Sequence, residues 1–275
     1  MRIVVPKETK AGELRVALVP DIISKLTKAG LEVIIESNAG RSAEYSDKQF
    51  SDAGAQVKSG DVLAGSDVVL SVQPLTATQM KTLKKGAITI SFLSPSTSQD
   101  SIDAAVSAGV TAISLEMVPR ISRAQSMDAL TSQALCAGYK ASLVAAELSP
   151  KFFPLLMTAA GTVTPAKVVV LGAGVAGLQA IATAKRLGAV VSAYDVRPAS
   201  ADEVKSMGAK FINLELEALE GAGGYAREMT EERANKQREL LTPYIASADV
   251  LITTAAVPGR TAPRLVTAQM VAQMM

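Results

Sequence analysis

The sequence predicts an α/β protein built from two Rossmann-like, doubly wound domains with mostly parallel sheets. Short β-branched runs alternate with helix-like runs, a pattern typical of parallel strands joined by helices. The alternation stops once, near residues 130–165, and then restarts. The chain has 275 residues, of which 48% are hydrophobic, so it can fill two cores. We therefore expect two α/β domains joined by a hinge.

The first domain is predicted to span residues 1–130. Its strands should be runs rich in valine, isoleucine and threonine, because branched side chains suit a pleated sheet. These runs are 2–5, 31–37, 67–72, 87–93 and 110–116. Helical patterns separate them at 21–30, 46–54, 76–86 and 98–108. The first of these helices is amphipathic and ends at Gly30, a typical helix stop.

The stretch 131–165 is predicted to be a connecting helix and a linker. A long helix is expected near 128–148, followed by FFPLLMTAAGTVTPA, whose proline, threonine and glycine content favours a linker. Cys136, the single cysteine, lies in this helical region, and we expect it to be a small core residue. One cysteine cannot form an internal disulfide, which fits a reducing compartment.

The second domain is predicted to span residues 166–275. Its expected strands are 167–172, 189–195, 210–215 and 249–255. The sequence stops at Met275, inside a further predicted helix.

A glycine-rich turn is the most specific local motif. Gly172, Gly174 and Gly177 form G-x-G-x-x-G after a buried strand, at the start of a helix that begins with Val175. The first glycine permits a tight turn, the second lets the backbone approach a pyrophosphate, and the third lets helix and strand pack closely. The helix N–H groups would meet the phosphate charge. This context predicts one dinucleotide site.

The second strand of this unit ends at Asp195, followed by Val196 and Arg197. A carboxylate in this position can accept hydrogen bonds from the adenosine ribose and would repel a 2′-phosphate. This favours NAD over NADP, although an arginine two residues on can also accept a phosphate. We expect Val175 and Val196 to line the same nucleotide site.

Composition excludes several other functions. The net charge is +2 and the basic residues are scattered, so we predict no nucleic-acid partner. The N-terminus, MRIVVPKETK, lacks the apolar stretch of a signal peptide, and the uncharged run between Lys167 and Lys185 is interrupted by three glycines. We predict a cytoplasmic protein, and no metal site.

The chain contains no histidine, the commonest proton shuttle of dehydrogenases near neutral pH. Lysine, tyrosine or aspartate can replace histidine, so a dehydrogenase of alcohols or amines stays open. Hydride transfer between two nicotinamide rings, however, requires no protein acid at the reacting carbon. The composition therefore suits nicotinamide-to-nicotinamide transfer.

The chain resembles the NAD(H)-binding first domain of the alpha subunit of proton-translocating nicotinamide nucleotide transhydrogenases, and more distantly the alanine dehydrogenases. The resemblance spans nearly all of the chain. The family continues past Met275 with another strand, so the resemblance implies that the second sheet is truncated at its C-terminal end. It rests on PRISRAQSMDAL (119–130), AGYKA (138–142), MTAAGTVTPAKVVVLGAGVAGLQAIATAKRLGA (157–189), DVRP (195–198), AGGYAREM (222–229) and ITTAAVPGRTAP (252–263).

The resemblance implies roles for the loop MVPRISRAQSMDALTSQ. Arg120, Gln125 and Asp128 would anchor the nicotinamide carboxamide and ribose and orient the ring. Thr131 stands where the family usually has a serine, and it keeps the hydroxyl. These residues are the expected catalytic positions, with Thr131 as a cofactor contact.

The resemblance also implies a closing loop in AGGYAREM. Gly224 would give the loop its freedom, and Tyr225 would close toward the bound nucleotide. Ala256, in ITTAAVPGRTAP, is a further expected nucleotide contact. The nucleotide is expected in the cleft between the two domains.

The function implied is hydride transfer between NADH and NADP⁺ held on a partner subunit, coupled to proton translocation by a membrane subunit. A homodimer, peripherally associated with the inner membrane through its partners, is implied as well. Two alternatives stay open, namely an alanine-type amino-acid dehydrogenase and a non-catalytic NAD-binding module. Arg15 would hold a carboxylate in an alanine dehydrogenase, but VVLSVQP and SFLSPS lack the lysine and histidine of that group.

Overall fold

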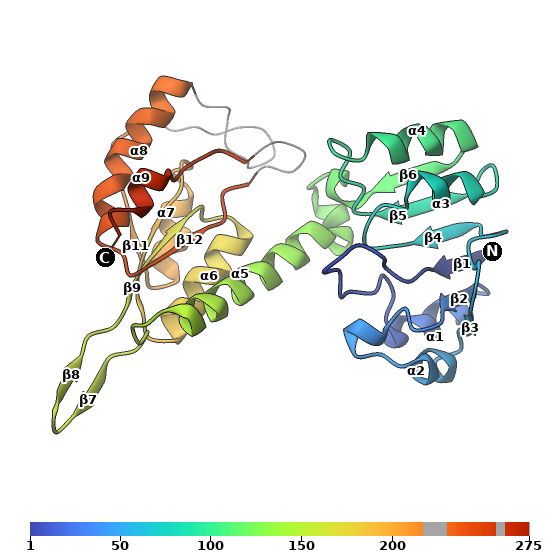
Figure 1. Ribbon diagram of the computed structural model, residues 1–275, viewed down its shortest axis with the longest axis horizontal. Coiled ribbons are helices and arrows are strands. Elements are labelled where there is room, and N and C mark those ends of the chain that lie inside the picture. Colours follow the sequence, from blue (N-terminus) through green and yellow to red (C-terminus); the bar gives the residue numbers. More distant parts are fainter. Residues whose placement is uncertain (217–229, 257–261, 275) are drawn as a thin grey trace. The chain divides into compact units, whose positions relative to one another are not determined.

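The structure is a computed structural model that describes residues 1–216, 230–256 and 262–274 (Figure 1). It divides into two compact units, Met1–Asp128 and Ala129–Met275. Each unit contains its own parallel sheet, so the predicted fold class is confirmed. The units are described one at a time.

The first unit has a six-stranded parallel sheet of order β3-β2-β1-β4-β5-β6 (Figure 1). Its strands are β1 Arg2–Val5, β2 Glu32–Glu36, β3 Gln56–Lys58, β4 Val68–Leu70, β5 Ile88–Ser91 and β6 Thr111–Ser114. Its helices are α1 Pro20–Lys28, α2 Asp47–Asp52, α3 Ala77–Thr82 and α4 Gln99–Ala108, with 3₁₀ turns η1 Arg41–Ala43, η2 Leu115–Met117 and η3 Ser122–Met127. The short polar strand β3 was not predicted, because QVK shows no apolar run.

Alternate residues of the strands enter two cores. Val4 and Ile34 pack on one face with side chains of α3 and α4. Val5 and Ile35 pack on the opposite face, with the fully buried Phe50 of α2. Strand side chains point to opposite faces in turn, so near-continuous apolar runs are needed when helices cover both sides. This is the doubly wound arrangement that the sequence predicts.

The second unit has a four-stranded parallel sheet of order β11-β10-β9-β12 (Figure 1). Its strands are β9 Lys167–Leu171, β10 Val190–Tyr194, β11 Lys210–Phe211 and β12 Val250–Thr253. Its described helices are α5 Ala129–Leu148, α6 Val175–Arg186, α7 Ser200–Ser206, α8 Glu231–Ala246 and α9 Ala268–Val271. One core joins the sheet to α5, α6 and α7, and a second joins it to α8 and α9.

The segment expected to be a linker contains a hairpin. Strands β7 Leu156–Thr158 and β8 Gly161–Val163 pair antiparallel, and the hairpin projects from the rest of its unit (Figure 1). All six strand residues are exposed. The short TAAG connection, with Gly161 at φ +143°, makes the reversal possible.

Cys136 is exposed, so its expected place in the core was wrong. Helix α5 packs on its neighbours through the side that carries Gly138 and Ser142, which are buried, and Cys136 lies away from that side. Helix α5 is apolar on much of its surface, so composition alone does not reveal which side is covered. No described helix is both long and apolar enough to cross a membrane.

Candidate functional site

The glycine-rich turn joins β9 to α6 in the second unit. Gly172 has φ +98°, and a Cβ there would lie 2.7 Å from the backbone nitrogen of Ala255. A Cβ on Gly177 would lie 1.8 Å from the carbonyl oxygen of Gly172. Both positions must therefore be glycine for reasons internal to the fold: backbone conformation and helix–strand packing.

Gly174 differs from its two neighbours in the motif. Its φ is −76°, which any residue can adopt, and a Cβ there would have no heavy atom of the described residues within 4 Å. Neither strain nor internal packing requires glycine at this position. The missing side chain leaves open surface on which a ligand can approach the backbone.

Gly174 is also the N-cap of the 12-residue helix α6. It has no side chain to accept from the N–H groups of the first turn, which no helical carbonyl can satisfy. The helix dipole adds partial positive charge at the same place. The start of α6 can therefore bind an anion such as a phosphate group through its backbone.

Asp195 follows β10 and contacts the glycine turn directly. Its Oδ2 accepts a 2.7 Å hydrogen bond from the backbone N–H of Ala173, between the first two glycines of the motif. The Asp195 side chain is 8% exposed. This hydrogen bond therefore connects the glycine motif with Asp195, the acidic residue at the end of the next strand.

Arg197 pairs with the same carboxylate. Its Nε donates to Oδ1 of Asp195 at 2.9 Å, and its Nη2 donates to Oδ2 at 3.0 Å. Burial raises the pKa of Asp195, but hydrogen bonds from Arg197 and Ala173 outweigh burial and hold the pKa below its usual range. The carboxylate is therefore ionised near neutral pH, and Arg197 faces Asp195 rather than an open phosphate site.

A cavity of about 340 Å³ adjoins Asp195 at the carboxyl ends of β10 and β11. Val196, Pro198 and Leu214 are among the residues that line it. Tyr194 lines it as well, and its hydroxyl donates to Oε1 of the buried Gln237 at 3.2 Å, which ties β10 to α8. Ligands of parallel α/β sheets bind at these strand ends.

Three further residues support the turn and were not singled out from the sequence. Thr254 donates from Oγ1 to the carbonyl oxygen of Gly172 at 2.9 Å. Ser142 of α5 donates to the carbonyl oxygen of Ala180 at 2.8 Å in a buried site. A Cβ on Gly138 would lie 2.0 Å from the carbonyl oxygen of Ala176, so α5 touches the first turn of α6. The segment AGYKA was the only sequence signal of this contact.

The loop with Arg120, Gln125 and Asp128 lies in the first unit, where η3 gives it a fixed shape. Ala124 is buried and anchors the loop, whereas Gln125 is exposed. The backbone N–H of Asp128 donates to the carbonyl oxygen of Gln125 at 3.2 Å. Arg120 Nε and Asp128 Oδ2 form an ion pair at 3.8 Å. The structure therefore brings these three expected catalytic residues together in one short segment.

The remaining expected site residues are placed as follows. Thr131 lies in the first turn of α5, in the second unit, and is partly buried. Ala256 is exposed just after β12. Gly224 and Tyr225 lie outside the described residues. Within the described residues, no group of three or more His, Cys, Asp or Glu side chains could hold a metal ion.

Comparison with protein families gives two matches that together cover most of the chain. Residues 4–137 match the family model described as alanine dehydrogenase/PNT, N-terminal domain. Residues 141–275 match alanine dehydrogenase/PNT, C-terminal domain.

Individual relatives fall into two groups. An NAD(P) transhydrogenase alpha subunit chain of Rhodospirillum rubrum is 47% identical over 284 residues, covering 100% of this chain and 74% of that protein. The alanine dehydrogenase of Mycobacterium tuberculosis is 32% identical over 285 residues, covering 100% of this chain and 70% of that protein. A solved transhydrogenase structure from Sinorhizobium meliloti matches with a TM-score of 0.88 and 42% identity, over 100% of this chain and 76% of that one.

Proposed function

The chain belongs to the alanine dehydrogenase/PNT family, and from this premise we propose that it is the NAD(H)-binding component of a proton-translocating transhydrogenase. It would exchange hydride between NADH and NADP⁺ bound to a partner subunit, while a membrane subunit couples this step to proton movement. The 47% identity to a transhydrogenase alpha subunit, against 32% to an alanine dehydrogenase, supports this branch of the family.

The main observation in favour of a nucleotide site is the open space around Gly174. Packing among the described residues accounts for Gly172 and Gly177, but it gives no reason for glycine at position 174. An approaching pyrophosphate does give a reason, because a Cβ would stand between the phosphate and the backbone. The uncapped start of α6, from Val175 onward, supplies N–H donors for that charge.

The adenosine ribose is assigned to Asp195. Its carboxylate is ionised and already accepts two hydrogen bonds at each oxygen. We therefore propose that a ribose hydroxyl replaces one of the two bonds from the Arg197 side chain. Its charge disfavours a 2′-phosphate, so we propose NAD(H) as the cofactor of this chain and NADP(H) as that of the partner. Because Arg197 forms an ion pair with Asp195, its guanidinium would attract a 2′-phosphate only weakly.

The nicotinamide end is assigned to Arg120, Gln125 and Asp128, with Thr131 as an additional hydroxyl. When bound, NAD(H) supplies the hydride chemistry itself. The task of these side chains is to hold the carboxamide and ribose so that one face of the ring is presented. Gly224, Tyr225 and Ala256 are proposed to complete the nucleotide contacts. No residue of this set has to move a proton, which agrees with a chain that has no histidine.

The partner is proposed to dock beside the same loop. Three large apolar side chains around it are more than half exposed, namely Met117, Ile121 and Met127. Apolar residues of this size, grouped on a polar loop, are typical of an interaction surface. Docking there would bring the second nicotinamide to the one held by this chain, and the chain would reach the membrane through that partner.

A homodimer is proposed from the hairpin β7–β8. Its side chains Leu156, Met157 and Val163 are exposed, and an isolated two-stranded hairpin is marginally stable in water. Pairing with a second copy of the chain would cover these side chains.

The test is reconstitution from purified proteins. We expect hydride exchange between NADH and an NADP⁺ analogue when the chain is mixed with the partner NADP-binding subunit, and none with either protein alone. Steady NADH formation from alanine and NAD⁺ by the chain alone would instead support an amino-acid dehydrogenase. NADH binding without any exchange in the mixture would support a non-catalytic NAD-binding module.

A further inference from the structure

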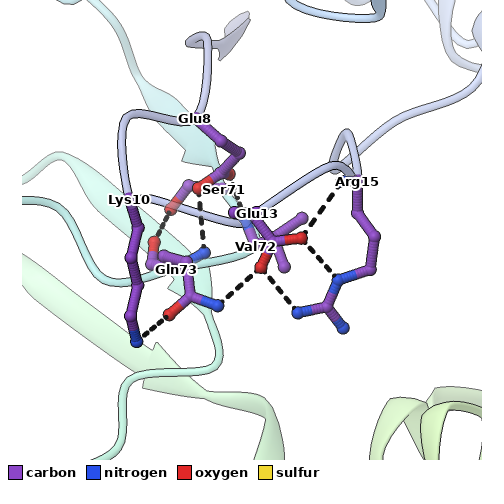
Figure 2. Close-up of polar contacts among 7 residues, drawn as sticks. All are labelled: Glu8, Lys10, Glu13, Arg15, Ser71, Val72 and Gln73. Atoms are coloured by element: carbon purple, nitrogen blue, oxygen red, sulfur yellow. Dashed lines mark hydrogen bonds and ion pairs between the residues drawn. The ribbon is translucent and has the colours of Figure 1, made fainter. Parts of the chain in front are cut away.

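In the first unit, carboxylate side chains bind the backbone of loops at the carboxyl ends of the strands. Glu8 accepts hydrogen bonds from the successive N–H groups of Val72 and Gln73, just after β4, at 2.6 and 3.2 Å (Figure 2). Asp47 accepts from the N–H of Asn38, just after β2, at 2.8 Å. These carboxylates supply acceptors to loop N–H groups that lie beyond the end of the strand.

Glu116 binds the loop that follows β5 in the same way. Its Oε2 accepts from the backbone N–H of Leu93 at 3.1 Å, and its Oε1 accepts from the N–H of Ser94. The hydroxyl of Ser114, the last residue of β6, donates to Oε2 at 2.6 Å. One carboxylate therefore connects the ends of β5 and β6 with the 3₁₀ turn η2, to which Glu116 belongs.

The backbone that Glu116 binds has an uncommon conformation. Ser94 has φ +49°, in the left-handed region that residues other than glycine rarely adopt. Hydrogen bonds from backbone N–H groups to a carboxylate are strong enough to offset the cost of such a conformation. On the other side of the loop, the N–H of Phe92 donates to the carbonyl oxygen of Val72 at 3.1 Å. The loop is thus fixed between the end of β4 and Glu116.

The segment proposed to hold the nicotinamide follows η2 directly. Arg120, its first residue, comes four positions after Glu116 in the sequence. The N–H of Val118 donates to the carbonyl oxygen of Leu115 at 3.4 Å and closes η2 just before this segment. The direction in which the chain leaves η2 therefore sets where Arg120 lies, and Glu116 fixes η2 to the sheet.

We propose that Glu116 is a positioning residue for hydride transfer. It holds η2 against the loop after β5 and so fixes the segment that carries Arg120, Gln125 and Asp128, without contacting the nucleotide itself. This inference rests on the function proposed above for that segment. Glu116 then acts on the rate of transfer more than on the affinity for NADH, because transfer depends on the alignment of the ring.

The first measurement is hydrogen–deuterium exchange on the full chain, without nucleotide or partner. The N–H groups of Ala124 and Asp128 donate within the segment, to the carbonyl oxygens of Ile121 and Gln125, at 2.9 and 3.2 Å. We expect Glu116→Ala to raise the exchange rate of these amides about tenfold, because the segment opens more often once η2 is released.

Asp47→Ala is the matched control. Asp47 also binds a hydroxyl, that of Ser37 at 2.7 Å, and its backbone partner Asn38 has φ +63°, so the bonding pattern of Glu116 is repeated at the end of β2. Strands β1 and β4 separate β2 from β5 in the sheet. We expect Asp47→Ala to lower the stability of the chain and to leave the exchange of residues 119–128 unchanged.

The second measurement uses the reconstituted system with saturating NADH. The partner subunit is saturating as well, because η2 carries Met117 of the proposed docking surface. We expect Glu116→Ala to slow hydride transfer about tenfold or more, and to change the dissociation constant of NADH by less than about twofold. Glu116→Gln keeps one oxygen acceptor and should transfer hydride at an intermediate rate. Asp47→Ala should transfer hydride like the wild type.

The proposal is wrong if folded Glu116→Ala keeps the wild-type exchange of residues 119–128, if it transfers hydride at the wild-type rate, or if Asp47→Ala causes the same changes. Glu116→Gln takes the place of Glu116→Ala in both measurements if the alanine variant does not fold, as judged by circular dichroism. If the wild-type chain exchanges no hydride with its partner, the proposed function fails, whereas the hydrogen-exchange result still decides whether Glu116 fixes the segment.

Discussion

The three glycines after β9 illustrate how one motif contains residues with different physical roles. Gly172 and Gly177 are required by the protein itself, because a Cβ on either would strike backbone atoms. A Cβ on Gly174 would have no atom of the described residues within 4 Å, and the φ of Gly174 is one that any residue adopts. At the scale of the single residue, it is therefore position 174 that points to a ligand.

The first prediction concerns Gly174→Ala. We expect the variant to fold like the wild type, since the added methyl group meets no described atom. We expect its affinity for NADH to fall about tenfold, or about 1.4 kcal/mol, because the methyl group blocks the pyrophosphate. Fluorescence titration with NADH and thermal melting would measure the two effects.

Gly177→Ala is the matched control for this experiment. Its Cβ would lie 1.8 Å from the carbonyl oxygen of Gly172, so we expect a loss of about 1–3 kcal/mol in the free energy of unfolding. The ligand argument fails if Gly174→Ala binds NADH as tightly as the wild type.

The second prediction concerns pH and Glu13. Hydrogen bonds from Arg15 lower the pKa of Glu13 to about 2 in the folded protein, below the value of about 4.3 in an unfolded chain. A lowered pKa adds stability that is fully present above about pH 4.3 and is lost as the pH falls toward 2. Between pH 6 and pH 3, we therefore expect the stability advantage of wild type over Glu13→Gln to shrink. Urea unfolding at each pH measures it.

Glu8 provides a control with the opposite sign. Burial raises the pKa of Glu8, so its ionised form is penalised in the folded protein, and protonation relieves the penalty as the pH falls. We expect the stability of wild type relative to Glu8→Gln to grow over the same range. If the stability difference from wild type changed in the same direction with pH for both variants, the opposite pKa shifts assigned to Glu13 and Glu8 would be wrong.

At the scale of the element, helix α5 has a glycine at the point where helix α6 packs closely against it. Gly138 lets α5 approach Ala176 at the start of α6, and the buried Ser142 hydroxyl bonds to the carbonyl oxygen of Ala180. Bulk on the approaching side of α5 would push against the first turn of α6. The N-terminal end of α6 is thus held by a neighbouring helix as well as by the glycine turn.

The third prediction concerns the hairpin β7–β8. Met157 is 73% exposed on a hairpin whose strand residues all face solvent. If a second copy of the chain covers it, Met157→Asp places a charge in an apolar interface, and we expect dissociation to monomers. Sedimentation velocity measures the mass. Val106→Asp, at an equally exposed position of α4, is the control and should not change the mass.

At the scale of the whole molecule, the two units offer different chemistry at equivalent places. In the second unit, the strand order reverses beside β9, where a glycine turn and Asp195 favour a dinucleotide. In the first unit, the reversal beside β1 is followed by a polar loop without a G-x-G-x-x-G motif, and Arg15 of this loop pairs with Glu13. The two units therefore differ in the side chains that they place where ligands of α/β sheets bind.

The fourth prediction separates binding from transfer in the reconstituted system. We expect Asp195→Ala to weaken NADH binding, because the ribose loses its proposed acceptor and the turn loses the hydrogen bond from Ala173 to Asp195. We expect Gln125→Ala to slow hydride transfer more than it weakens binding, because the role proposed for Gln125 is to orient the ring. NADH titration and stopped-flow exchange measure both quantities. If both variants bind NADH and turn over like the wild type, the proposed roles of Asp195 and Gln125 are wrong.

The sequence alone determined the fold class, the parallel sheets and the position of the glycine motif. Strand runs, helix periods and turn glycines are local patterns, and each is set by residues close together in the chain. The strand at 56–58 and the hairpin at 156–163 were missed because neither contains a clear apolar run.

Only the tertiary structure decided which groups meet. The bond from Ala173 to Asp195, the fork of Arg197 on the same carboxylate and the pairing of Glu13 with Arg15 and Gln73 depend on side-chain geometry that no spacing rule records. The exposure of Cys136 likewise depends on which side of α5 is covered. Local periodicity fixes an element, whereas its partners are fixed by how the sheet brings distant strand ends together.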